Sequence, residues 1–387
     1  MKTLRSGRNR RKWIYVLLLM GLLGLSGCGS PSSASVEMSS QTELVKTGSM
    51  ELQYAENFAV DYYEDGYKML ITLPDSKRYL LVPEGQPVPG GLDEDVSILQ
   101  EPLQNIYLVA SGAMDMFASL DAVDQIRFSG QKQENWYIQT AKDAMAAGDM
   151  IYAGKYSKPD YELLVSEGCD LAIENRMITH SPEVVEMLQS FDIPVMIEYS
   201  SYEQHPLGKV EWVKFFGALT GREAEAEEAF AEQTEILEEV ESGEKTGKTI
   251  AFFYVTSNGL IQVRQSTDYI PKLIELAGGR YIFEDLEDSG SGRSTLNMQV
   301  EDFYAGAKDA DILIYNSSID GGVTTVDELI GKCNILKDFK ALQEGQVYCT
   351  TNDMYQQSMA IGYLLQDMHT VLTDDDTAKL RYLFLLQ

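Results

Sequence analysis

The feature that most constrains the fold is an alternation of short apolar strands with amphipathic helices, which occurs twice along the chain. Helical stretches such as Asp160–Val165 and Pro182–Leu188 separate the strands of the first run. Strand–helix–strand repetition is typical of a parallel sheet covered by helices on both faces. The strands expected in this run are Ile106–Ala110, Ile126–Phe128, Leu171–Ile173 and Val195–Ile197.

A second α/β run follows a long helical stretch. Thr249–Val255 and Ile312–Tyr315 have strand patterns, and the helix Pro271–Ala277 ends at a glycine pair. In the helical stretch between the two runs, Val210–Val240, apolar stripes recur at helical spacing with glutamates on the other face. Two helices joined at Thr220-Gly221 also fit this pattern, but we predict one long interdomain helix over residues 206–242.

The N-terminal 27 residues have the parts of a secretory signal peptide. Six basic residues lie between Lys2 and Lys12, and the apolar run Trp13–Leu25 follows. This run is shorter than the about 20 residues that span a bilayer, so it predicts a cleaved signal rather than a membrane helix. Leu25-Ser26-Gly27-Cys28 resembles the lipobox of bacterial lipoproteins, in which the cysteine carries acyl chains. A plain signal peptide with a chance cysteine is the alternative.

These patterns predict five segments. They are a lipoprotein signal peptide (1–27), a serine-rich flexible tether (28–50), an N-terminal α/β lobe (51–205), the interdomain helix (206–242) and a C-terminal α/β lobe (243–387). The body of the protein is expected to be lipid-anchored through Cys28 on the extracytoplasmic face of the cell membrane.

Charge and motifs exclude several functions. The formal net charge is −29, which repels phosphate backbones and argues against nucleic-acid binding. No HExxH, Gly-x-Ser-x-Gly or CxxC pattern occurs, so no enzyme is expected. The three histidines, His180, His205 and His369, lie far apart in sequence. A site for a bare Zn or Mn ion, formed by ligands from distant parts of the chain, is a lesser alternative to chelate binding. Cys333 and Cys349 either pair or remain buried thiols.

The order of these pieces resembles one family over about residues 100–370. The family is the substrate-binding lipoproteins of ABC transporters for cobalamin, haem and iron-siderophores. Cys169 stands where that family usually has proline. The resemblance depends on an ordered set of short segments: Lys158–Leu164, Gly168–Ile173, His205–Trp212, Leu276–Gly279, Gln299–Asp302, Ala310–Ile314 and Gly345–Tyr348.

The resemblance implies both architecture and role. It implies two Rossmann-like lobes joined by a long helix, with the ligand in the cleft between the lobes. It implies a monomer that captures a metal chelate without a cofactor of its own and delivers it to an ABC permease and its ATPase. A sensory lipoprotein that does not transport is the other alternative. Glu162 and Glu301 lie where the family carries a glutamate that docks on the permease.

The ligand-binding residues are expected in the loops that follow the strands. Aromatic side chains give large contact areas, and arginine donates forked hydrogen bonds to anionic oxygens, which suits a bulky anionic chelate. The candidate residues are Trp136, Tyr137, Arg176, Tyr199, Tyr202, Arg264, Tyr269, Arg293 and Tyr355.

Overall fold

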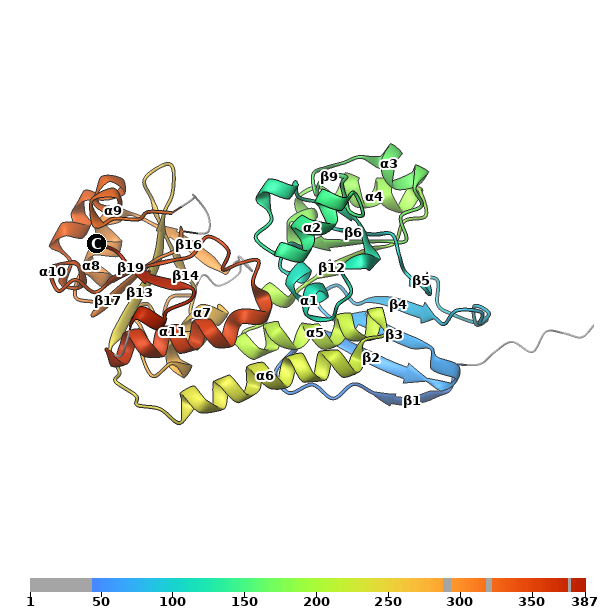
Figure 1. Ribbon diagram of the computed structural model, residues 1–387, viewed down its shortest axis with the longest axis horizontal. Coiled ribbons are helices and arrows are strands. Elements are labelled where there is room, and N and C mark those ends of the chain that lie inside the picture. The colour runs from blue at the N-terminus through green and yellow to red at the C-terminus, as the bar shows by residue number, and fades with distance from the viewer. Residues whose placement is uncertain (1–43, 288–293, 318–321, 375–376) are drawn as a thin grey trace, which may run out of the picture. The chain divides into compact units, whose positions relative to one another are not determined.

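The computed structural model of the chain describes residues 44–287, 294–317, 322–374 and 377–387 (Figure 1). The predicted signal peptide, Cys28 and most of the predicted tether lie outside these residues. The described residues form one compact unit, which contains an N-terminal sheet and two α/β lobes. In the described part of the chain, no helix has the length and apolar character needed to cross a membrane.

The N-terminal sheet has its strands side by side in chain order, with β4 and β5 parallel and the other pairs antiparallel. Val60 and Leu81 pack on one face and Leu80 and Val82 on the other, so alternate residues bury both faces. Strand β1 corrects the tether prediction, because pairing with β2 orders residues that were expected to be flexible. The strands are β1 Lys46–Ser49, β2 Phe58–Tyr63, β3 Lys68–Thr72, β4 Lys77–Val82 and β5 Val96–Gln100.

The first lobe contains a parallel sheet in the order β12-β11-β6-β7-β8, which confirms the predicted α/β class. Helix α3 begins where the Asp160 carboxylate accepts the Leu163 N–H at 3.1 Å. The strands are β6 Ile106–Leu108, β7 Ile126–Ser129, β8 Ile151–Tyr152, β11 Leu171–Asn175 and β12 Val195–Glu198, with the small pair β9 Gly154–Lys155 and β10 Lys158–Pro159. The helices are α1 Ala113–Ser119, α2 Gln139–Ala147, α3 Tyr161–Ser166 and α4 Pro182–Ser190.

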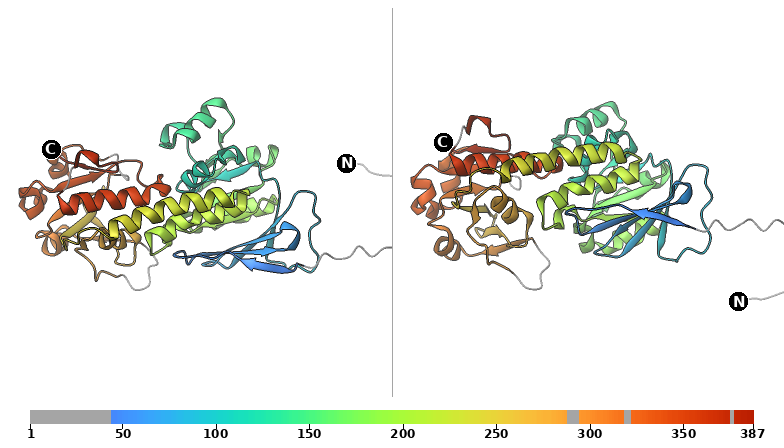
Figure 2. Two further views of the ribbon diagram at one scale, coloured as in Figure 1. Left: turned by 60° about the horizontal axis from the view of Figure 1, so that its bottom comes forward. Right: turned by 90° about the horizontal axis from the view of Figure 1, so that it is seen from below.

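The single helix predicted over 206–242 is wrong. The chain forms α5 Pro206–Thr220 and α6 Glu223–Glu241, which lie side by side (Figures 1 and 2). Gly221 between them has a φ of 70°, a left-handed conformation that ends a helix and that glycine adopts without strain. A Cβ on Gly217 would lie 2.6 Å from the Ala226 Cβ, so glycine also permits the close approach of α5 and α6.

The second lobe contains a mixed sheet in the order β16-β14-β13-β17-β18-β19, with β15 paired to β13. Strands β13, β17 and β18 are parallel, as the sequence predicts. The strands are β13 Thr249–Val255, β14 Ile261–Arg264, β15 Arg280–Tyr281, β16 Thr295–Met298, β17 Ile312–Tyr315, β18 Val347–Thr350 and β19 Leu383–Leu385. The helices are α7 Tyr269–Leu276, α8 Val300–Ala307, α9 Val326–Lys332, α10 Lys340–Gln343 and α11 Ile361–Thr373.

Helix α6 leads the chain from the first lobe into β13 of the second. It packs against α11 (Figure 2). The Gly362 N–H of α11 donates to the Gln233 Oε1 of α6 at 2.9 Å. The structure contains no disulfide among the described cysteines Cys169, Cys333 and Cys349.

Candidate functional site

A pocket of about 310 Å³ lies where residues of both lobes meet, and we call it the interlobe pocket. In the first lobe it takes residues that follow or end β6, β11 and β12, because the carboxyl ends of parallel strands open at one edge of a sheet. In the second lobe it takes residues of β14, β16 and the start of α7. Its lining is Ala110, Ser111, Gly112, Asn175, Glu198, Ser201, Lys209, Gln262, Arg264, Asp268, Tyr269, Ser294, Thr295 and Tyr355.

Arg264 is the cation that the second lobe contributes, and its side chain is held on several sides. Its Nη1 lies 3.2 Å from Asp268 Oδ2, and its Nη2 donates to the Tyr355 hydroxyl. The Asn316 Nδ2 donates to the same hydroxyl at 2.6 Å. The Tyr281 hydroxyl accepts the backbone N–H of Arg264 at 3.0 Å and donates to its carbonyl at 2.9 Å. The guanidinium is therefore fixed in place before any ligand binds.

Lys209 is the cation on the side of the first lobe. It lies in the first turn of α5, the helix that directly follows that lobe and packs on its helix α1. Its side chain is 3% exposed, and Nζ donates to the Ser201 Oγ at 3.3 Å. Nζ also lies 5.3 Å from the centre of the Tyr269 ring. Among the described residues, no carboxylate oxygen lies within 4.0 Å of this ammonium. Burial lowers the Lys209 pKa, because it disfavours the charged form.

Three carboxylates, two of them buried and that of Asp115 partly buried, lie near these cations, and a backbone N–H group donates to each of them. Glu198 accepts the Ser200 N–H at 2.7 Å, Asp268 accepts the Ile270 N–H at 2.9 Å, and Asp115 accepts the Met359 N–H at 2.7 Å. Burial raises the pKa of Glu198 and of Asp268, and it raises that of Asp115 to about 6. The site therefore combines two cations with carboxyl groups that ionise less readily than usual.

A smaller hollow of about 110 Å³ shares Ser201, Asp268 and Ser294 with the interlobe pocket and adds Tyr202. The Arg176 guanidinium lies 4.6 Å from the centre of the Tyr202 ring. The centroids of the Tyr199 and Tyr202 rings are 6.4 Å apart. Three of the aromatic and arginine residues predicted from the sequence thus gather beside the pocket.

The predicted ligand-binding residues divide into several groups. Arg264, Tyr269 and Tyr355 line the interlobe pocket, and Arg293 lies outside the described residues. Trp136 is 1% exposed, and its Nε1 donates to the Ser129 Oγ at 3.0 Å, so it is a core residue that does not line the pocket. The Tyr137 side chain is 47% exposed and is also absent from the lining.

The segment before α11 connects the second lobe to the first. The Gln356 Oε1 accepts the Tyr137 N–H at 2.8 Å, and its Nε2 donates to the Asn135 carbonyl at 2.8 Å. Together with the Met359–Asp115 hydrogen bond, these contacts hold the segment that carries Tyr355 against the first lobe. Tyr137 is therefore part of the contact between the lobes through its backbone.

Sequence reasoning missed Lys209 as a site residue. It belongs to Pro206–Leu219, a stretch of α5 in which every residue is buried although it contains Lys209, Glu211 and Lys214. Three charges in a helix otherwise rich in apolar and aromatic residues are the signal that could have identified it, since buried charges require partners.

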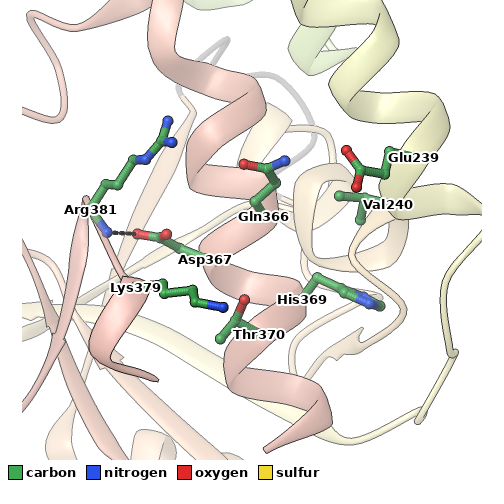
Figure 3. A pocket seen from close by; sticks show the side chains of 8 residues that line it. All are labelled: Glu239, Val240, Gln366, Asp367, His369, Thr370, Lys379 and Arg381. Atoms are coloured by element: carbon green, nitrogen blue, oxygen red, sulfur yellow. Dashed lines mark hydrogen bonds between the residues drawn. The ribbon is translucent and has the colours of Figure 1, made fainter. Parts of the chain in front are cut away.

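A separate cavity of about 360 Å³ lies between α6 and α11 (Figure 3). In it, the Asp367 Oδ2 accepts the backbone N–H groups of Arg381, Tyr382 and Leu383 at 2.9, 2.6 and 3.0 Å. These bonds tie the chain entering β19 to α11, which is a structural role. None of the described residues that line this cavity belongs to a strand, so we place the functional site in the interlobe pocket.

No group of three or more His, Cys, Asp or Glu side chains is placed to hold a metal ion in the part of the chain that the structure describes. The candidate site is therefore described by its cations and hydroxyl groups.

No protein-family model matches the chain. Two uncharacterized lipoproteins of Methanocaldococcus jannaschii are similar to it along most of their length. One is 24% identical over 395 residues, covering 93% of this chain and 92% of the relative. The other is 24% identical over 368 residues, covering 89% and 90% respectively.

Solved structures of periplasmic binding proteins have the same fold. A possible iron-binding periplasmic solute-binding protein of Staphylococcus epidermidis has a TM-score of 0.54 and 17% identity, covering 70% of this chain and 98% of that one. The periplasmic haem-binding protein of Vibrio cholerae has a TM-score of 0.55 and 14% identity, with 69% and 98% covered. The catecholate-siderophore binding protein of the same organism has a TM-score of 0.54 and 13% identity, with 70% and 94% covered. The chain has the two-lobe fold of these binding proteins.

Proposed function

We propose that this chain is the extracytoplasmic substrate-binding component of an ABC importer. It captures an anionic metal chelate between its lobes and delivers it to the permease and its ATPase, without a catalytic step. Iron-siderophore, haem and cobalamin-type chelates are the candidates from the sequence. The observation that carries the proposal is the convergence of Lys209 and Arg264, from different lobes, on one pocket at the strand ends.

The location follows from the leader sequence and the relatives. The lipobox-like segment ending at Cys28 supports a lipid anchor on the outer face of the cell membrane, and the relatives are named lipoproteins. Metabolic labelling with a palmitate analogue tests this proposal. Wild-type protein should become labelled and partition with membranes, whereas Cys28→Ala should remain unlabelled.

Ligand capture is tested by native mass spectrometry of the purified protein, followed by titration of ligand-free protein with the candidate chelates. A bound small molecule, or saturable stabilisation by one chelate, is the expected result. Folded protein that carries no ligand and responds to no chelate or anion would contradict the proposed function.

We further propose that Glu162 and Glu301 dock the loaded protein on the permease. Each is exposed and occupies the second position of a helix, α3 in the first lobe and α8 in the second. Neither makes an ion pair or side-chain hydrogen bond with another described residue. Exposed rim charges affect orientation and association rate more than they affect the fold, so these two carboxylates are suited to pairing with arginines of a permease.

Reversing both docking charges should impair uptake and leave ligand binding intact. For Glu162→Arg with Glu301→Arg, we expect ligand uptake into cells or proteoliposomes to fall roughly tenfold, because attraction becomes repulsion at both lobes. Glu228→Arg with Glu235→Arg, on the exposed face of α6, is the matched control with the same charge change. Equal uptake by the two double variants would refute the docking role.

A further inference from the structure

Most of the residues that line the interlobe pocket have polar or charged side chains. Apart from Ala110 and Gly112, every residue that the structure places in the lining presents a hydroxyl, amide or charged group. The only rings among them belong to Tyr269 and Tyr355, and both carry hydroxyl groups. Porphyrin and corrin macrocycles have broad apolar faces, which binding sites usually cover with hydrophobic and aromatic side chains. In the described lining of this pocket, only the rings of Tyr269 and Tyr355 are available for such contact.

The dimensions of the pocket favour a small ligand. Its volume of about 310 Å³ is extended by the adjoining hollow of about 110 Å³. Pockets for drug-sized ligands range from roughly 300 to 1,000 Å³. The volume of the interlobe pocket is therefore near the lower end of that range, which suits a ligand smaller than a porphyrin or corrin macrocycle.

Lys209 indicates the charge of the ligand. A buried ammonium without a direct carboxylate partner is costly, because it loses its hydration and gains no ion pair in return. Its one side-chain hydrogen bond in the described residues is to the neutral Ser201 hydroxyl. The nearby carboxylates of Glu198 and Asp268 are already bonded to backbone N–H groups, and Asp268 also to Arg264. Glu198 and Asp268 attract the Lys209 ammonium from beyond 4.0 Å, and a bound anion would supply the direct ionic contact that they do not.

Arg264 and the surrounding hydroxyl groups indicate an anion with several oxygens. A guanidinium donates to two oxygens of a carboxylate or oxyanion in parallel, whereas an ammonium acts as a point charge. The two cations come from different lobes, and Ser111, Ser201 and Thr295 add hydroxyl donors from both. A ligand that bonds to all of them needs oxygens on opposite sides.

We propose that the interlobe pocket binds a compact, oxygen-rich anion, with Lys209 as its first-lobe anchor and Arg264 as its second-lobe anchor. This inference rests on the proposed binding function and narrows it. The same chemistry occurs in a free oxyanion and in a small metal chelate whose surface consists of carboxylate oxygens. The proposed ligand class disfavours haem and cobalamin as cargo of this pocket.

The test is isothermal titration of ligand-free full-length protein at pH 6.5 with molybdate, phosphate, citrate, ferric citrate, haemin and cyanocobalamin. We expect saturable binding of at least one of the four compact anions and none of the two macrocycles. If ferric citrate binds and citrate alone does not, the ligand is a metal chelate. Binding of molybdate or phosphate identifies a free oxyanion.

Variants separate binding from folding. Lys209→Met should weaken the compact anion roughly 100-fold, because it removes a buried charge partner. The thermal midpoint should change little, since the relief of Lys209 desolvation offsets the attraction that Glu198 and Asp268 lose. Lys214→Met is the matched control, because Lys214 is a second buried lysine of α5 that pairs with Glu211 and Glu227 and does not line the pocket. Its anion affinity should equal that of the wild type.

Three outcomes overturn the inference. Binding of haemin or cyanocobalamin that Lys209→Met leaves unchanged would refute it and keep the proposed capture function. Compact-anion binding that is equal in wild type and Lys209→Met would refute the assigned anchor. Folded protein that binds no ligand of either class would refute both the inference and the proposed function.

Discussion

Replacing Glu211 by alanine should destabilise the protein by about 3–5 kcal/mol, the range seen when one partner of a buried charged cluster is removed. The Glu211 side chain is fully buried on α5. Its Oε2 accepts backbone N–H groups of Gln53, Tyr54 and Ala55 at 3.1, 2.8 and 2.8 Å, and its Oε1 accepts that of Gln53 at 2.9 Å. The variant leaves these donors and the Lys214 ammonium, 3.5 Å away, without their shared acceptor.

Urea unfolding monitored by circular dichroism measures the loss, and hydrogen exchange locates it. Exchange at the amides of residues 53–55 should accelerate more than exchange in the second lobe. Glu227→Ala is the control, because Glu227 also pairs with Lys214 but its side chain is 63% exposed. We expect it to lose no more than about 1 kcal/mol, as exposed ion pairs do. If Glu211→Ala were as stable as this control, the buried carboxylate would have no role in holding the N-terminal segment.

A second buried carboxylate extends this attachment. Glu203 accepts the backbone N–H groups of Glu56 and Asn57 at 2.9 and 3.0 Å and the Trp212 Nε1–H at 2.8 Å. The Tyr54 ring stacks on His205 with centroids 4.4 Å apart. The segment between β1 and β2 is thereby fixed to the start of α5, the helix that carries Lys209. The N-terminal sheet is thus joined to the element that positions the first-lobe anchor.

The two-lobe α/β architecture was predictable because it depends on local periodicity. Buried parallel strands such as Leu171–Ile173 and Ile312–Tyr315 are short continuous apolar runs, and the helices between them show apolar stripes. The reversal of the chain at Gly221 could not be predicted from the hydrophobic pattern, since the apolar stripes continue on both sides of the turn. The left-handed backbone of one glycine decides between one helix and two. Similarly, β1 is short and fully exposed, so only its pairing with β2 identifies it.

The site was predictable in part, because the positions at the ends of strands can be identified from the sequence. Arg264, Tyr269 and Tyr355 follow or end elements of the second lobe, and strand-end positions converge in such folds. Trp136 has the same kind of position in sequence, but its ring turns inward to bond Ser129. Lys209 lies within a helix, where a charged residue usually faces solvent. Only the packing of α5 between other elements buries it, and a sequence pattern does not contain that packing.

The affinity of the interlobe pocket for an anion should fall as the pH rises from about 6 toward 9. Burial raises the pKa of Asp115 to about 6, so this group gains negative charge as the pH rises through that value, and burial also raises the pKa values of Glu198 and Asp268. Burial lowers the pKa of Lys209, so its positive charge is lost earlier than that of an exposed lysine. Both changes weaken attraction for an anion, and Arg264 stays charged throughout.

Molybdate is a suitable probe for this pH dependence, because its own charge stays constant over the range. We expect its Kd to increase at least about tenfold between pH 6 and 9, which corresponds to one unit of pKa difference between the empty and occupied states. Binding at pH 7 should take up protons, seen as a dependence of the titration heat on the ionisation enthalpy of the buffer. Asp115→Asn should flatten the lower part of the profile, since the amide oxygen still accepts the Met359 N–H but carries no charge.

A flat profile in the wild type, with binding intact, would show that the buried groups around Lys209 keep the same charge with and without the anion. The electrostatic account of the pocket would then fail, even if the ligand class proved correct.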